Sequence, residues 1–174
     1  MLVLDSRAIE PGYTGHETGR LLLAELYKHL TGQEMPEIAT TERGKPYFLD
    51  SPYHFSISHT KRRVVCAISD RPIGIDAEEL DRNINLQLAE KILSPSEKEE
   101  FDQAADKRIA LLTFWVLKEA QAKCNGDGLR GYPNHTNFSL SDPRVEIFDE
   151  DDDKEPKFLL AIIKEGEIPF DETQ

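Results

Sequence analysis

Residues 109–117 form a run that is apolar on almost every face of a helix, and this run limits the folds that are open to the chain. Helical spacing extends the segment to residues 106–124, and Gly126 follows at a position suited to the left-handed conformation that ends many helices. A helix that is apolar nearly all round must be covered by other elements on most of its faces. The sequence therefore predicts a globular fold built around this helix.

Two further helices are indicated earlier in the chain. Residues 16–30 space their leucines and a tyrosine at the period of one helical face, and Gly32 follows as a stop signal. Residues 94–97 read Ser-Pro-Ser-Glu, a capping box with Ser94 at the cap, proline at the first helical position and Glu97 at the third. This box predicts a short helix over residues 94–101.

Short β-prone runs fill most of the remaining chain. Five of them lie between the first two helices, at residues 38–41, 47–49, 54–58, 64–69 and 73–78. Glycine and proline interrupt these runs, and their brevity and spacing predict an antiparallel meander. Three more strands are expected after the long helix, at residues 138–140, 145–148 and 158–163, with the charged run 149–155 as an exposed hairpin tip.

The order of these elements is helix, strands, helices, strands, which predicts an α+β fold. We expect two similar fused lobes, each with a helix packed on a small antiparallel sheet. The division is expected near Arg71, which gives an N-terminal lobe of residues 1–71 and a C-terminal lobe of residues 72–174. No obvious sequence repeat accompanies this division.

The formal net charge is −12, from 21 basic and 33 acidic residues. Binding to a nucleic-acid backbone needs clustered cations, so this balance argues against a nucleic-acid-binding protein. Residues 43–71 reverse the local sign, with six basic residues against two acidic ones. This strip suggests a small polyanionic ligand, although an ordinary solubilising surface has the same composition.

Cys66 and Cys124 are too few and too far apart for a disulfide framework or a zinc site. No apolar run approaches the roughly 20 residues that a bilayer needs, and the first residues lack the basic and apolar regions of a secretory signal. We therefore expect a cytoplasmic protein that contacts no membrane and keeps both thiols reduced.

Asp76 and Glu78 lie two residues apart in a predicted strand, so their carboxylates project from the same side. Two such carboxylates repel each other unless a cation lies between them. A strand with an acidic face turned to solvent is the alternative interpretation of this pair, because many surface strands alternate in this way.

Trp115, Glu119 and Lys123 lie on successive turns of one stripe of the long predicted helix. An ordinary stabilising pair of Glu119 with Lys123 is the alternative interpretation. Lys118 and Glu119, however, follow directly on the apolar run and are expected to enter a buried region, where unpaired charges are costly.

Two further segments carry groups that suit an anion. Ser58, His59 and Thr60 end a predicted strand just before a run of cations, and hydroxyls and an imidazole at such an end can bind phosphate oxygens. An incidental histidine in a turn is the alternative interpretation. Residues 43–46 read Arg-Gly-Lys-Pro, which alone indicates only a β-turn.

These pieces occur together in a particular order. The order is Gly44-Lys45-Pro46, Phe55-Ser56-Ile57-Ser58-His59, Gly74-Ile75-Asp76-Ala77-Glu78, and Trp115-x-x-Lys118-Glu119-Ala120-x-x-Lys123 with Gly126-x-Gly128-Leu129 after it. In this order and spacing the chain closely resembles the surfactin-type 4′-phosphopantetheinyl transferases. The first two strings are common, whereas the last two are specific. Residues 94–101 also look like that family's Phe-Ser-x-x-Glu helix start, so the resemblance spans about residues 16–163.

The resemblance implies transfer of the phosphopantetheine arm of coenzyme A (CoA) to a serine hydroxyl of an acyl or peptidyl carrier protein, with release of 3′,5′-ADP. By likeness, Asp76, Glu78 and Glu119 hold Mg²⁺, a hard cation that suits carboxylate oxygens. Mn²⁺ suits an all-oxygen site as well. Glu119 is also the candidate general base for the attacking serine, either directly or through a water molecule.

The remaining candidates bind the cofactor end of CoA. By the same likeness, Lys123 and His59 act as charge stabilisers on the pyrophosphate, and Lys118 and Ser58 are further candidates there. The likeness also places Lys45, Pro46 and Arg43 at the nucleotide end. Similar proteins have their site between two lobes, which fits motifs drawn from both sides of the predicted division.

The chain departs from the family in its N-terminal lobe, which is expected to be shortened. Little precedes residues 16–30, where similar proteins carry basic residues that engage the 3′-phosphate, and Arg20, Lys61, Arg62 and Arg63 are open alternatives for that contact. A non-catalytic protein that keeps the fold and binds CoA or a carrier protein is the alternative function. We expect a monomer. The carrier proteins of the family it resembles are typically acidic, so we expect this acidic chain to dock them through a local apolar or basic patch.

Overall fold

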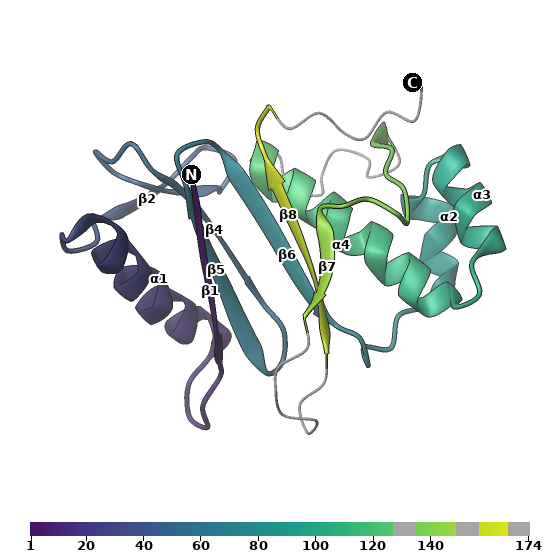
Figure 1. Ribbon diagram of the computed structural model, residues 1–174, viewed down its shortest axis with the longest axis horizontal. Helices are drawn as coiled ribbons and strands as arrows, with labels where there is room; N and C mark the ends of the chain where they lie inside the picture. The colour runs from purple at the N-terminus through teal and green to yellow at the C-terminus, as the bar shows by residue number, and fades with distance from the viewer. Residues whose placement is uncertain (127–134, 149–156, 167–174) are drawn as a thin grey trace.

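The protein is described here by a computed structural model in which residues 1–126, 135–148 and 157–166 are placed. The elements are β1 (Leu2–Ala8), α1 (Gly15–Thr31), β2 (Ile38–Thr40), β3 (Pro46–Phe48), β4 (His54–His59), β5 (Arg63–Ser69), β6 (Ile73–Glu79), the 3₁₀ turn η1 (Leu86–Leu88), α2 (Ala89–Ile92), α3 (Pro95–Gln103), α4 (Lys107–Asn125), β7 (Val145–Phe148) and β8 (Phe158–Lys164). Figure 1 shows α1 at one side of the molecule and α4 in the other half, with the strands between and in front of them. The predicted α+β fold class is confirmed.

The first half packs α1 against an antiparallel sheet in the order β1-β5-β4. Thr14 caps α1 in a reciprocal capping box with Glu17, and Gly32 ends the helix in the left-handed conformation. Leucines of α1 pack against the inner residues of β5, and these side chains form one buried cluster. The predicted helix over residues 16–30 and the individual strands of this half are thereby confirmed. The predicted meander is wrong, because β2 and β3, β4 and β5, and β6 belong to three different sheets.

The second half packs α4 against an antiparallel sheet in the order β6-β8-β7. Asp106 caps α4 by accepting hydrogen bonds from two backbone amides of its first turn, and Gly126 ends the helix with a φ of 77°. Leu111, Leu112 and Leu117 on α4 are completely buried. The predicted burial of this helix on most of its faces is confirmed, as is the capping box of α3.

A third buried cluster joins the two halves. It consists of Val65 and Ala67 from β5, Ile73, Ile75 and Ala77 from β6, and Phe158 and Leu160 from β8. β4 also lies beside β6, although the two strands belong to different sheets. Two hydroxyls of β4 link them, because Ser56 Oγ accepts from the Ile75 amide and Ser58 Oγ accepts from the Ala77 amide, both at 3.0 Å. The predicted division near Arg71 falls in the link between β5 and β6, and as a domain boundary it stays a prediction.

The structure corrects the sequence-based elements at three points. Residues 138–140 are not a strand, because the backbone amides of Phe138 and Leu140 donate to the carboxylates of Glu97 and Glu100 on α3 instead of to a neighbouring strand. β1 and the short helical pieces η1 and α2 were not predicted. The expected hairpin tip at residues 149–155 and the Gly128-Leu129 pair lie outside the described residues. Within the placed part of the chain, no helix is both long enough and apolar enough to cross a membrane.

The contact between β6 and α4 generates a test of the fold. Gly74 has no side chain where β6 meets α4, and a Cβ there would overlap the Ala120 carbonyl oxygen and the Cys124 amide nitrogen. Because these are backbone atoms that cannot turn away, we expect Gly74→Ala to lower the free energy of unfolding by about 3 kcal/mol. Urea unfolding followed by circular dichroism measures this loss.

Gly19→Ala is the matched control for Gly74→Ala. A Cβ at Gly19 would meet only side-chain atoms of Ile57 and Val64, at 3.0 and 3.3 Å, and alanine has the higher helix propensity in α1. We therefore expect a much smaller change in stability for this variant. Equal losses for the two variants would contradict the close approach of β6 to α4.

Candidate functional site

Asp76 lies at the point where β4, β6 and α4 meet, and it is the centre of the candidate site. Its Oδ1 accepts from Lys123 Nζ at 2.7 Å and from Ser58 Oγ at 2.9 Å. Lys123 Nζ also lies 3.2 Å from Ser58 Oγ, which closes a triangle of polar contacts. The Asp76 and Ser58 residues retain only 6% and 4% of their accessible surface. The interpretation of Asp76 as a solvent-facing surface charge is therefore wrong.

The local sequence explains this placement. Ile73, Ile75 and Ala77 enter the cluster between the halves, so alternation along β6 turns Gly74, Asp76 and Glu78 the other way. Gly74 meets α4 there, which brings the next residue on the same face, Asp76, beside the last turns of that helix. Glu119 and Lys123 are one helical turn apart on α4, and both act on Asp76.

Glu119 adds a second carboxylate to Asp76. Burial raises the pKa of Glu119, and the negative charge of Asp76 raises it further, whereas Lys123 and Arg82 oppose the shift. Asp76 Oδ2 is buried and has no hydrogen-bond partner among the described residues. A buried carboxylate oxygen that has no partner and lies near a second carboxylate is unfavourable when no cation is bound. The same oxygen donors suit a divalent cation.

Glu78 lies further along the same face of β6 but is turned to another partner. Its carboxylate pairs with Arg82, whose guanidinium also lies over the ring of Trp115 at 5.8 Å. The described residues contain no group of three or more His, Cys, Asp or Glu side chains placed to hold a metal ion. The structure thus brings Asp76 and Glu119 together without Glu78, and the three-carboxylate metal site stays a prediction.

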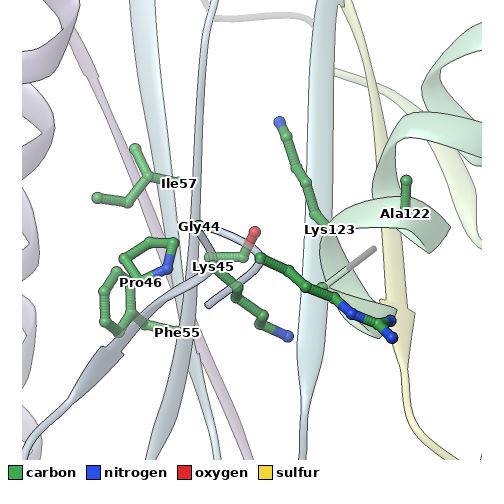
Figure 2. A pocket seen from close by; sticks show the side chains of 10 residues that line it. Gly44, Lys45, Pro46, Phe55, Ile57, Ala122 and Lys123 are labelled. Atoms are coloured by element: carbon green, nitrogen blue, oxygen red, sulfur yellow. The ribbon is translucent and has the colours of Figure 1, made fainter. Parts of the chain in front are cut away.

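A cavity of about 240 Å³ lies at one end of the site, between the β2–β3 turn, β4 and the end of α4. Arg43, Lys45, Pro46 and Lys123 are among the residues that line it, and Figure 2 shows Lys45 and Pro46 on one side of the cavity with Lys123 on α4 opposite. Lys45 Nζ donates to the Cys124 carbonyl at 2.6 Å, and burial lowers the pKa of this ammonium group. Residues from both halves of the chain therefore form this cavity.

A larger hollow of about 810 Å³ lies at the other end. His59, Arg62, Glu78 and Arg82 line it, together with residues that precede α1. The ring of His59 packs directly against Gly15, the first residue of α1. β4 runs from the cavity to the hollow, because Ser56 and Ile57 line the first, His59 and Thr60 line the second, and Ser58 lies between them. The candidate site therefore lies between two openings.

Lys118 is not part of this site, which corrects its prediction as a cofactor-binding residue. The residue is 3% exposed, and its Nζ pairs with Glu97 at 2.8 Å and donates to the Thr136 carbonyl at 2.9 Å. Burial lowers the pKa of Lys118, and Glu97 opposes this shift. The expectation that Lys118 enters a buried region is confirmed, and its charge is balanced there by a carboxylate that also accepts from the Phe138 amide at 2.9 Å.

The sequence reasoning missed Arg82. This residue follows β6 in a turn in which its amide donates to the Glu79 carbonyl at 3.0 Å. It reaches Glu78 and Trp115, and it lowers the pKa of Glu119, so it influences two of the three predicted metal ligands. The spacing of four between Glu78 and Arg82 is a helical signal, and it could not have indicated a contact at the end of a strand.

Comparison with known sequences then identifies the family. The family model described as the 4′-phosphopantetheinyl transferase superfamily matches residues 72–167, which is more than half of the chain. The chain belongs to this superfamily. The matched segment includes Asp76, Glu78, Glu119 and Lys123, so all of the predicted metal ligands lie in the part that defines the phosphopantetheinyl transferase match.

Named relatives agree with the family match. The 4′-phosphopantetheinyl transferase Sfp of Bacillus subtilis (strain 168) is 40% identical over 95 residues, which cover 52% of this chain and 42% of Sfp. A 4′-phosphopantetheinyl transferase of Bacillus subtilis is 34% identical over 124 residues, covering 68% of this chain and 54% of the relative. HetI of Nostoc sp. PCC 7120, another 4′-phosphopantetheinyl transferase, is 31% identical over 131 residues, covering 71% and 49%. The aligned part of the chain thus spans about half the length of these phosphopantetheinyl transferases.

The raised pKa of Glu119 generates a test of the site's electrostatics. Below the ordinary glutamate pKa of 4.5, Glu119 is neutral in the folded and the unfolded protein and costs nothing. At pH 7 the folded state must carry a charge that burial and Asp76 disfavour. We therefore expect Glu119→Gln to raise Tm at pH 7 by about 2–4 °C with a chelator present, the shift that about 1 kcal/mol gives in a chain of this size.

Glu25→Gln is the control for this measurement. Glu25 lies on α1 and is paired with Arg7, whose hydrogen bond lowers the pKa of the Glu25 carboxyl. Its removal is therefore expected to give no gain in Tm. The gain of Glu119→Gln is expected to shrink as the pH falls toward 4.5, and a loss of Tm at pH 7 would show that Glu119 is not held at an electrostatic cost.

Proposed function

We propose that the protein transfers the 4′-phosphopantetheine group of CoA to a serine of an acyl or peptidyl carrier protein and releases 3′,5′-ADP. The observation that carries this proposal is the pair of neighbouring carboxylates, Asp76 and Glu119, with Lys123 beside them between two openings. A diphosphate that bridges the two openings would meet both a cation site and an ammonium group. Membership in the superfamily supports the same activity.

Asp76, Glu78 and Glu119 are the residues proposed to hold Mg²⁺. The donor set fits this ion, because all three are carboxylates and Asp76 Oδ2 is a buried oxygen without a partner among the described residues. Glu78 joins the set only if its carboxylate leaves Arg82. When bound, the metal ion would neutralise charge that develops on the 5′-phosphate of the leaving 3′,5′-ADP. Mn²⁺ satisfies the same oxygen donors.

Glu119 is proposed as the general base. Its raised pKa makes it a better proton acceptor than an ordinary surface glutamate, and its position next to Asp76 places it at the centre of the candidate site. In the proposed step the serine oxygen forms a bond to the β-phosphorus of CoA, the bond from that phosphorus to the 3′,5′-ADP oxygen breaks, and the serine proton passes to Glu119 directly or through water. Lys123 and His59 are proposed to stabilise the diphosphate charge from opposite ends of the site.

The cavity lined by Arg43, Lys45 and Pro46 is proposed to receive the nucleotide end of CoA. Its lining combines the apolar rings of Pro46 and Phe55 with three cationic side chains, which suits a base next to phosphate groups. The residue that binds the 3′-phosphate stays open among Arg20, Lys61, Arg62 and Arg63. Arg62 already pairs with Glu79 and Asp81, which makes it a less available cation than the exposed Lys61.

A non-catalytic protein that binds CoA or a carrier protein is the second candidate function. The pairing of Glu78 with Arg82 favours it, because a site without its third carboxylate binds a divalent cation more weakly. A monomeric state, a cytoplasmic location and the absence of nucleic-acid and membrane contacts stay predictions under either function.

Intact-mass measurement of a carrier protein tests the proposed transfer. Incubation of the purified protein with CoA, Mg²⁺ and an apo carrier protein is expected to add the mass of phosphopantetheine to the carrier. Asp76→Asn and Glu119→Gln are each expected to slow the transfer by about 10²–10⁴-fold, the usual contribution of a catalytic acid or base. Glu25→Gln, which removes a carboxylate of α1 outside the site, is expected to leave the rate unchanged.

Calorimetry with CoA separates the two candidate functions. Binding of CoA without a mass shift on any of several carrier proteins supports the non-catalytic protein.

Turnover by Asp76→Asn and Glu119→Gln at the wild-type rate would show that the metal and base assignments are wrong.

A further inference from the structure

The Ser58 hydroxyl has a complete set of hydrogen bonds inside the protein. A serine hydroxyl has one hydrogen to donate and two lone pairs that accept. Ser58 Oγ donates to Asp76 Oδ1 at 2.9 Å and accepts from the Ala77 amide at 3.0 Å and from Lys123 Nζ at 3.2 Å. The residue is 4% exposed. No donor capacity is left for a bound phosphate.

These hydrogen bonds conflict with the role that the sequence suggested for Ser58, which is to bind phosphate oxygens. Phosphate oxygens of CoA accept hydrogen bonds, so a serine that binds them must donate its hydrogen. Ser58 could do so only by releasing the buried carboxylate of Asp76, which would lose one of its two contacts. The hydrogen bonds of Ser58 therefore argue against the prediction that its side chain binds the cofactor. Its hydroxyl contacts Asp76 instead.

The contacts around Asp76 are arranged asymmetrically. Both Ser58 and Lys123 bind Oδ1, whereas Oδ2 is buried without a partner among the described residues. Ser58 is itself held by the amide of Ala77, the residue that follows Asp76 on β6. Strand β6 thus fixes both the donor and the acceptor of the Ser58–Asp76 hydrogen bond, and the carboxylate is held with one particular oxygen free.

We propose that Ser58 is a positioning residue that holds the Asp76 carboxylate so that Oδ2 is presented to a divalent cation. The inference rests on the metal site of the proposed function. A hydrogen bond to a metal-binding carboxylate from a neighbouring side chain sets the orientation of that ligand, and its loss typically weakens metal binding by about 10–100-fold. Ser58 lies on β4, so the first half of the chain acts on a metal ligand of the second half.

Ser56 provides a matched control within the same strand. It is also buried and also accepts a backbone amide of β6, that of Ile75 at 3.0 Å. Ser58 donates to a carboxylate, whereas the contact that ties Ser56 to β6 is this amide alone among the described hydrogen bonds. Removing the Ser56 hydroxyl therefore loosens the contact between β4 and β6 without acting on Asp76.

Mn²⁺ binding in the absence of CoA tests the inference, with free Mn²⁺ measured by electron paramagnetic resonance. We expect Ser58→Ala to weaken Mn²⁺ binding by about 10–100-fold and Ser56→Ala to leave it near the wild-type value. Ser58→Cys nearly preserves the size of the side chain but has only a weak hydrogen-bond donor. We expect this variant also to bind Mn²⁺ more weakly than the wild-type protein, and it keeps the test valid where Ser58→Ala folds poorly. In an Asp76→Asn background, Ser58→Ala is expected to cause no further loss.

Several results would overturn the inference. Equal Mn²⁺ affinities for Ser56→Ala and Ser58→Ala would show that Ser58 only joins the strands, and unchanged affinity in Ser58→Ala and Ser58→Cys would remove it from the metal site. Lack of Mn²⁺ binding by the wild-type protein would also overturn it. The carrier-protein assay stays separate: weaker Mn²⁺ binding in Ser58→Ala, in a protein that transfers nothing, supports the role of Ser58 and contradicts only the proposed transfer.

Discussion

The charge balance around the buried carboxylate of Asp76 is the constraint on which the rest of the site depends. A carboxylate taken out of water must be paired or hydrogen-bonded, and Lys123 and Ser58 satisfy one of its oxygens. Glu119 adds a second carboxylate near Asp76, and burial together with the Asp76 charge raises the pKa of Glu119. Neighbouring buried carboxylates carry an unfavourable electrostatic free energy. Such local destabilisation is typical of functional sites, where binding of a ligand of opposite charge relieves it. For this site the proposed ligand of opposite charge is a divalent cation.

The site exists only because the two halves of the chain pack against each other. Ser58 and the β2–β3 turn come from the first half, whereas Asp76 and α4 come from the second. A cluster of buried apolar residues joins the halves, and serine hydroxyls of β4 replace the backbone ladder that a continuous sheet would have between β4 and β6. Gly74 allows β6 to approach α4 closely enough for Asp76 to meet Lys123. Fold stability and site geometry therefore depend on the same contacts.

The parts of the fold and of the site that the sequence predicted are those set by local geometry. Alternation along β6 placed Asp76 and Glu78 on one face, and the helical period placed Glu119 and Lys123 on one stripe of α4. The errors come from partners distant in sequence. β1 is a strand because it pairs along the whole of β5, and Lys118 is withdrawn from the site by Glu97, which is brought to it by the packing of α3 on α4. Local patterns contain no information about such pairings.

Anomalous diffraction from crystals grown with Mn²⁺ and CoA tests the central claim most directly. We expect one Mn²⁺ peak where β4, β6 and α4 meet, within coordination distance of Asp76 Oδ2 and of Glu119, with Glu78 turned from Arg82 to the metal ion. A map of the same crystals with no peak at this position, or with Glu78 still paired with Arg82 and the ion bound elsewhere, would contradict it.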